Sequence, residues 1–142
     1  MERAAGVVVV PIDTEHNVLL VKEYCAGADA FVLSLPGGSI IVGESVEDAA
    51  ARELREETGF TAQRMIKLSY AYTHPSTTNR KSYTFLGYDL KLDSSGKTEE
   101  LIETVKMPLE DALRYAYEDF QTDVTTVGNL LMAQNKLKQL NL

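Results

Sequence analysis

Short apolar runs alternate with polar turns along most of the chain. Runs of this length that are rich in β-branched and aromatic side chains are typical of β-strands. The pattern predicts strands at residues 7–10, 18–22, 31–35, 66–72, 82–90 and 102–107. The first run is apolar at every position, which indicates a strand with both faces buried.

One segment near the middle of the chain spaces its apolar residues as a helix does. It covers residues 45–58, where Ser45 stands at the position of an N-cap. Gly59 follows at the position where a left-handed C-terminal cap is expected. The sequence therefore predicts a helix with both ends defined by their own residues.

Two further helices are predicted near the C-terminus. One covers residues 108–117 and begins with Pro108, because proline is favoured in the first turn of a helix. The other covers residues 124–137 and is capped by Thr122 or Asp123. Strands interspersed with helices predict an α/β fold, in which a mixed sheet is covered by helices on both faces.

The composition narrows the class of protein. The 142 residues carry 14 Lys and Arg against 21 Asp and Glu, a net charge of −7. This length predicts one domain, residues 1–142. The acidic balance disfavours nucleic acids and membranes as partners, because both bind clustered basic residues. Cys25 is the only cysteine, which excludes an internal disulfide and favours a cytoplasmic protein.

The predicted helix at residues 45–58 carries more acidic residues than packing requires. Glu53, Glu56 and Glu57 are spaced at i, i+3 and i+4, so they share one face of the helix. Three carboxylates this close repel one another unless a cation lies between them. The alternative is a solvated charged face, with Arg52 as a local partner.

The residues around this helix match a longer spaced motif, G-x5-E-x7-R-E-U-x-E-E-x-G-U, where U is a bulky apolar residue. The matching residues are Gly38, Glu44, Arg52, Glu53, Leu54, Glu56, Glu57, Gly59 and Phe60. This is the Nudix box, and the sequence from Gly38 to Phe60 resembles the Nudix hydrolases. The resemblance implies an α/β/α sandwich with a mixed sheet. It also implies an enzyme that hydrolyses the diphosphate linkage of a nucleoside diphosphate derivative.

The resemblance gives the acidic cluster a role as a metal site. We expect Glu53, Glu56 and Glu57 to be ligands, with the Gly37 carbonyl as a further one. Hard oxygen ligands select Mg²⁺ over zinc or copper, with Mn²⁺ as a substitute. A local cluster of bound cations would also allow an acidic protein to hold a diphosphate.

Other residues of the motif are assigned supporting or catalytic roles. In the family, the residues that match Arg52 and Glu44 hold the loop and the helix together. The proton of the attacking water needs a base, and Glu56 is one candidate. In the ADP-ribose pyrophosphatase branch, a glutamate in a comparable loop reaches the metals or the water. The resemblance points to Glu100 for this role, with Glu99 as the alternative. An exposed acidic loop without a catalytic role is the other interpretation.

The substrate is indicated by residues beyond the motif. Pro75 lies 15 residues after Phe60, a spacing that resembles the branch acting on ADP-ribose and nucleotide sugars. The polar loop that follows makes His74 and Arg80 candidate substrate contacts, and His74 another candidate base. Gly38 is a further candidate, because glycine lets a ligand approach the backbone. The alternative for this loop is a solvated hairpin tip.

The predicted function is therefore metal-dependent hydrolysis of ADP-ribose or a nucleotide sugar, giving a nucleoside monophosphate and a phosphorylated group. The first alternative is a nucleoside triphosphate pyrophosphatase that clears modified nucleotides. The second is a catalytically silent domain that senses a nucleotide. The partner in each case is a small nucleotide, and a homodimer is one assembly that the resemblance allows.

Overall fold

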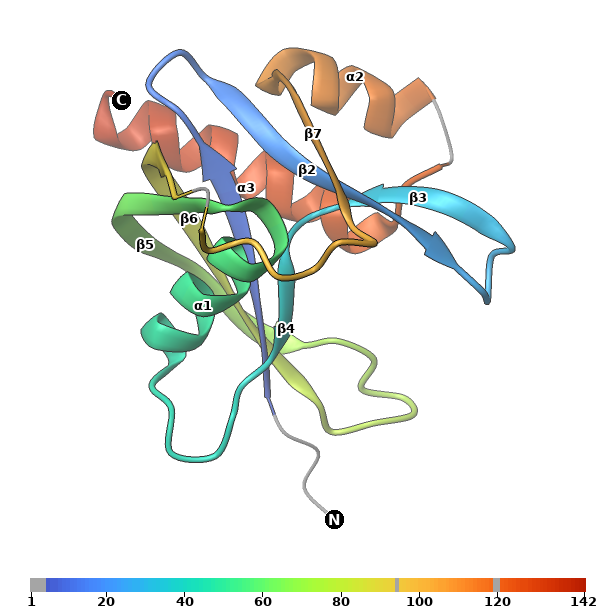
Figure 1. Ribbon diagram of the computed structural model, residues 1–142. Coiled ribbons are helices and arrows are strands. Elements are labelled where there is room, and N and C mark those ends of the chain that lie inside the picture. Colours follow the sequence, from blue (N-terminus) through green and yellow to red (C-terminus); the bar gives the residue numbers. More distant parts are fainter. Residues whose placement is uncertain (1–4, 94, 119–120) are drawn as a thin grey trace.

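The computed structural model describes residues 5–93, 95–118 and 121–142. A mixed sheet lies between α1 on one face and α2 and α3 on the other (Figure 1). This arrangement confirms the predicted α/β fold. The elements in chain order are β1 (Gly6–Ile12), β2 (Asn17–Cys25), β3 (Ala30–Ser34), β4 (Gly37–Ser39), α1 (Val46–Thr58), β5 (Phe60–Tyr72), β6 (Lys81–Leu92), β7 (Glu103–Pro108), α2 (Leu109–Glu118) and α3 (Val124–Leu140).

The sheet has the strand order β3-β2-β1-β6-β5, with β4 paired to β1 and β7 paired to β2. The β1–β6 pair is parallel and the others are antiparallel, so the sheet is mixed. Strand β1 is central: Val7 and Val9 pack toward α1, whereas Val10 and Ile12 pack toward α2 and α3. The all-apolar run therefore forms a strand buried on both faces, as predicted.

Strand β4 was not predicted, because the predicted strand at residues 31–35 ends before it and no further strand was expected until residue 66. It pairs antiparallel with the first half of β1, and Gly37 lies opposite Val8. A Cβ atom on Gly37 would lie 2.3 Å from the Val7 carbonyl oxygen, so only glycine permits this close pairing. Glycine is common in turns, but here Gly37 and Gly38 allow a short strand.

The helix ends agree with their predicted caps, with one correction. The Ser45 hydroxyl accepts a hydrogen bond from Asp48 N at 3.1 Å, and Gly59 has a φ of 76°. Asp123, rather than Thr122, caps α3. Pro108 was predicted to begin a helix. It instead ends β7, because it pairs with Asn17 of β2. In the described ranges, no helix is long and apolar enough to cross a membrane.

Candidate functional site

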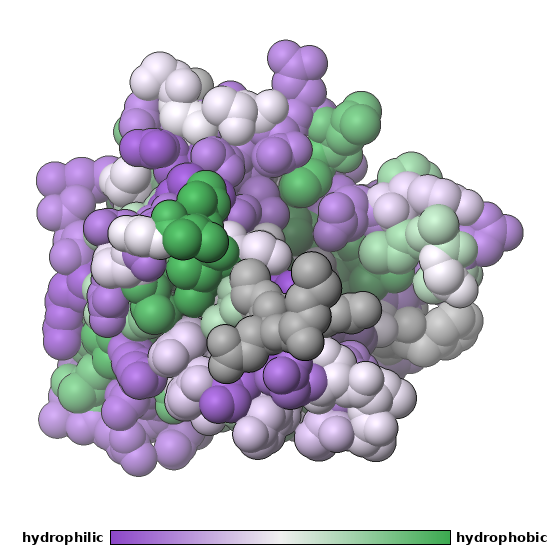
Figure 2. All heavy atoms as spheres, turned by 90° about the horizontal axis from the view of Figure 1, so that it is seen from below, coloured by the Kyte–Doolittle hydropathy of each residue, from purple (hydrophilic) through white to green (hydrophobic). Residues whose placement is uncertain are grey.

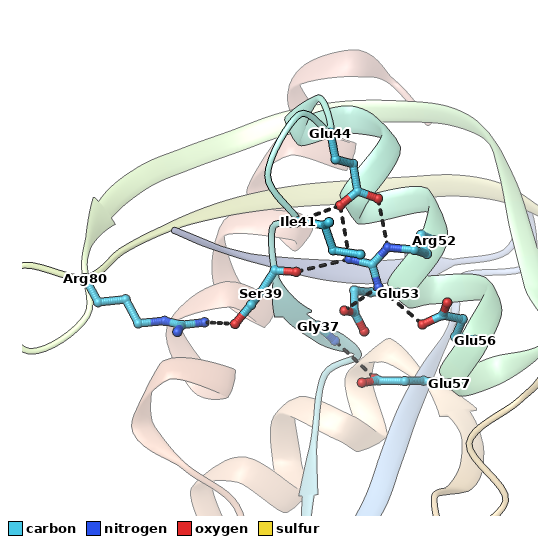
Figure 3. A network of polar contacts seen from close by, with 9 residues as sticks. All are labelled: Gly37, Ser39, Ile41, Glu44, Arg52, Glu53, Glu56, Glu57 and Arg80. Carbon is cyan, nitrogen blue, oxygen red and sulfur yellow. Dashed lines mark hydrogen bonds and ion pairs between the residues drawn. The ribbon is translucent and has the colours of Figure 1, made fainter. Parts of the chain in front are cut away.

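Arg52 is the centre of a polar network that joins α1 to the loop before it (Figure 3). Its guanidinium holds the Glu44 carboxylate with two parallel hydrogen bonds, Nε to Oε1 at 2.8 Å and Nη2 to Oε2 at 3.1 Å. This two-point pairing fixes orientation as well as distance. It also lowers the pKa of Glu44, chiefly through the hydrogen bond from Arg52.

The same guanidinium reaches three other groups. Nη1 donates to Glu53 Oε1 at 2.8 Å and to Glu56 Oε2 at 3.3 Å. Nη2 donates to the Ser39 carbonyl at 3.1 Å. Because these acceptors surround it, the pKa of Arg52 is raised and the cation is permanent. The structure therefore places Arg52 against the loop glutamate and two of the three helix glutamates that the motif singles out.

Glu57 differs from the other glutamates because it is buried, with 8% of its surface exposed. Its Oε2 accepts a hydrogen bond from Gly37 N at 3.1 Å. Burial, together with the nearby charges of Glu53, Glu23 and Glu99, raises the pKa of Glu57 to about 8, against the lowering effect of the Gly37 hydrogen bond. A cation beside this carboxylate would favour its charged form and so offset the rise in its pKa.

Gly38 brings the backbone of β4 against α1. A Cβ atom at this position would lie 2.4 Å from Glu53 Oε1, so any side chain would displace the carboxylate. Gly37 and Gly38 thus contact Glu57 and Glu53 respectively. The two glycines and the two glutamates form one compact unit.

The glutamates of α1 do not converge on one point as the sequence predicts. Glu53 and Glu56 both turn toward Arg52, and Glu57 turns toward Gly37 N. Among the residues that the structure describes, no three acidic, histidine or cysteine side chains are arranged to hold a metal ion. The oxygen donors themselves, carboxylates beside a backbone carbonyl, are those that Mg²⁺ prefers.

The acidic loop after β6 is tied to the end of α1. Thr98 N and Glu99 N donate to the Glu56 carbonyl at 3.0 and 3.1 Å. The charge of Glu99 also acts on Glu57, although the side chains of Glu99 and Glu100 are both exposed. Of the two candidate bases in this loop, the geometry favours Glu99 over Glu100.

Glu23 is a neighbour of the cluster that the sequence did not single out. It lies on β2 opposite Val32 of β3, and its charge contributes to the raised pKa of Glu57. Its sequence context is that of an ordinary polar residue in a strand, so no local signal distinguishes it. Only the sheet topology brings it near α1.

The two candidate substrate residues of the β5–β6 hairpin have different surroundings. Arg80 Nη2 donates to Ser39 Oγ at 3.1 Å (Figure 3). Arg80 and Gly38 both line a cavity of about 280 Å³. His74 is exposed in the hairpin turn, where its carbonyl accepts from Thr77 N and Thr78 N. It does not line that cavity.

The loop after β4 and the β5–β6 hairpin reach the same end of the molecule (Figure 1). Viewed from that end, the surface is mostly hydrophilic, and the apolar side chains form separate small areas (Figure 2). Such a surface suits a polar, charged ligand better than an apolar one.

The chain is similar to known proteins over most of its length. The NUDIX domain family matches residues 2–126. The chain is 32% identical to the ADP compounds hydrolase NudE of Escherichia coli, over 94% of this chain and 72% of that protein. It is 29% identical to the ADP-ribose pyrophosphatase of Bacillus subtilis, over 80% of this chain and 63% of that protein.

A solved structure is also similar. A crystal structure of an ADP compounds hydrolase superposes with a TM-score of 0.85 and 31% sequence identity, covering 96% of this chain and 74% of that one. The chain spans about two thirds of the length of the relatives it matches.

Proposed function

The chain belongs to the Nudix family, and from this premise we propose that it hydrolyses the diphosphate linkage of an ADP compound, with ADP-ribose or a nucleotide sugar as substrate. The products are a nucleoside monophosphate and a phosphorylated group. The observation that carries the proposal is the packing of Glu53 and Glu57 against Gly38 and Gly37, beside the Arg52 network.

A divalent cation, Mg²⁺ with Mn²⁺ as a substitute, fits the donors of this cluster. Glu53, Glu56 and Glu57 would hold it, together with the Gly37 carbonyl. The raised pKa of Glu57 supports this, because a buried carboxylate among other acids is stabilised by a cation. When bound, the cation supplies charge neutralisation for the diphosphate and acidifies a water.

The residues of the chain supply positioning and proton transfer. Arg52 fixes the loop to α1, so that the glutamates keep their place while the substrate binds. A carboxylate accepts the proton of the attacking water, and Glu56 and Glu99 are the candidates favoured by the geometry. Arg80 lies where it can pair with a phosphate oxygen of the substrate.

The names of the relatives support an adenine nucleotide as substrate. One relative is called an ADP-ribose pyrophosphatase and another an ADP compounds hydrolase. The proposal extends to one catalytic domain in a reducing, cytoplasmic setting, which the single Cys25 favours. A homodimer stays a prediction, which light scattering on the purified chain would test.

The test is a hydrolysis panel with Mg²⁺ or Mn²⁺, in which the products are identified. ADP-ribose, nucleotide sugars, nucleoside triphosphates and dinucleoside polyphosphates are compared with one another. Release of AMP and ribose 5-phosphate from ADP-ribose supports the proposal. Pyrophosphate released from a triphosphate as the preferred reaction overturns it in favour of a triphosphate pyrophosphatase. Tight binding of a nucleotide without turnover overturns it in favour of a sensor.

A further inference from the structure

The backbone of Arg80 is fixed within its own hairpin. Its N donates to Thr78 Oγ1 at 3.2 Å. Its carbonyl accepts from Thr73 N at 3.0 Å and from Thr73 Oγ1 at 3.2 Å. Because both backbone groups of Arg80 are bonded inside the hairpin, its side chain leaves the start of β6 in a defined direction, toward β4 (Figure 3).

The guanidinium of Arg80 lies where β1 and β4 pair. Its Nη2 donates to Ser39 Oγ at 3.1 Å. Ser39 of β4 pairs with Gly6 of β1, and a Cβ atom on Gly6 would lie 2.8 Å from the same Nη2. The guanidinium therefore occupies the space that a side chain at Gly6 would need. Ser39 supplies its hydrogen-bond acceptor, and Gly6 supplies the room.

The charge of Arg80 is available to a ligand, whereas that of Arg52 is compensated by three glutamates. In the described part of the chain, no carboxylate lies within ion-pair distance of the Arg80 guanidinium. A guanidinium carries several N–H donors, and Ser39 engages one of the two nitrogens at its end. The remaining donors can pair with a phosphate at the cavity that Arg80 lines.

The chemistry of the Ser39 side chain suits this arrangement. A long arginine side chain that is free in solution must be ordered when it binds an anion, and this ordering costs conformational entropy. A serine hydroxyl is neutral, so it orients the guanidinium and leaves the positive charge in place. A carboxylate at the same position would orient the guanidinium but would also neutralise it.

We propose that the Ser39 hydroxyl positions Arg80 to bind the phosphates of the substrate. Ser39 is a positioning residue, because its hydroxyl acts on the substrate only through the guanidinium of Arg80. Its carbonyl has a separate role, since it accepts a hydrogen bond from Arg52. The inference rests on the proposed function, because it concerns how the same substrate is held.

The first test compares the binding of ADP, which carries a diphosphate, with that of adenosine, which carries none. Calorimetry in EDTA measures both affinities, because the proposed hydrolysis needs a divalent cation. Ser39→Ala removes the hydroxyl and keeps the carbonyl that holds Arg52. It should weaken ADP binding by about tenfold and leave adenosine binding unchanged. Ser39→Thr keeps a hydroxyl and should bind ADP as the wild type does.

Two further measurements separate positioning from a general structural effect. Arg80→Met should weaken ADP binding by about tenfold or more, and Ser39→Ala added to it should cause no further loss. With ADP-ribose and Mg²⁺, Ser39→Ala should raise KM by about tenfold and leave kcat within about twofold of the wild-type value. Ser95→Ala is the matched control, because Ser95 is an exposed serine whose hydroxyl bonds Asp93 and does not line the cavity.

Three outcomes overturn the inference for variants whose circular dichroism matches that of the wild type. The first is an ADP affinity of Ser39→Ala equal to that of the wild type. The second is a loss caused by Ser39→Ala that is as large in the presence of Arg80→Met as in its absence. The third is an equal loss in Ser39→Thr and Ser39→Ala. Because ADP binding is measured without turnover, a substrate panel without hydrolysis refutes the proposed function alone. An active enzyme whose ADP affinity does not depend on Ser39 refutes only this inference.

Discussion

Glu57→Gln should stabilise the protein at alkaline pH in the absence of divalent cations, while it strongly reduces hydrolysis. The folded protein raises the pKa of Glu57 to about 8, against an ordinary value of 4.5. That difference corresponds to roughly 5 kcal/mol for the ionised group at high pH. Relaxation and water penetration reduce such costs, so we expect a gain of about 2–3 kcal/mol in the free energy of unfolding. Glutamine keeps an oxygen that can accept from Gly37 N.

The gain should depend on pH in a defined direction. Because the folded protein raises the pKa of Glu57, it binds this proton more tightly than the unfolded chain does. The cost of ionisation is absent below pH 4.5. It grows between pH 4.5 and about 8, as the carboxyl loses its proton, and is constant above that. The variant and the wild type should therefore have similar stabilities at pH 4.5 and differ most above pH 8.

Urea unfolding followed by circular dichroism in EDTA, at pH 5 and pH 8.5, measures this difference. Glu15→Gln is the control, because it removes one charge from an exposed turn between β1 and β2. Mg²⁺ added at pH 8.5 should raise the stability of the wild type and not that of Glu57→Gln. Hydrolysis by Glu57→Gln should fall by about 100-fold or more. A stability difference that is the same at both pH values, or no larger than that of Glu15→Gln, would refute the reasoning.

Three further substitutions test the rest of the site. Gly38→Ala should reduce kcat by about 100-fold, because the new methyl group displaces the Glu53 carboxylate; steady-state kinetics with the far-ultraviolet spectrum as a folding control measures it. Arg52→Lys should lower kcat by about 10- to 100-fold, since an ammonium group cannot form the two parallel bonds of the guanidinium, and loop proteolysis should speed up. Glu99→Gln should lower kcat by about 100-fold or more, whereas Glu100→Gln should leave kcat near the wild-type value. The reverse result would make Glu100 the base.

The sequence predicted the positions of the strands and helices better than it predicted their ends. Residues 7–10 form a continuous apolar run and residues 45–58 have helical periodicity, and β1 and α1 lie where these patterns indicate. Strand β5 begins at Phe60, six residues before the predicted start at Ile66, since it is paired with β6 from that point. Pairing with a neighbouring strand can extend a strand beyond its apolar run. The sequence of one segment does not show which strand it pairs with. The same reason explains why β4 was missed.

The candidate site likewise contains residues that are close in sequence and residues that are far apart in sequence. The motif brought together Glu44, Arg52 and Glu53, whose contacts run through one loop and one helix. Its spacing reflects a local geometry, so the sequence alone could indicate it. Glu23 comes from β2, and only the packing of this strand beside β1 brings it to the site. Residues of this second kind have no fixed spacing from the motif.

The protein and its proposed ligand are both negatively charged, and cations beside β4 allow the two to bind. A net charge of −7 repels a diphosphate at long range. At the site, however, Ser39 accepts from two guanidinium groups, through its carbonyl from Arg52 and through its hydroxyl from Arg80. These two cations stand on the two sides of one short strand, one facing the glutamates and one facing the cavity. A substrate whose phosphates cross β4 would meet positive charge on both sides, so the local field and not the net charge decides which ligand the protein holds.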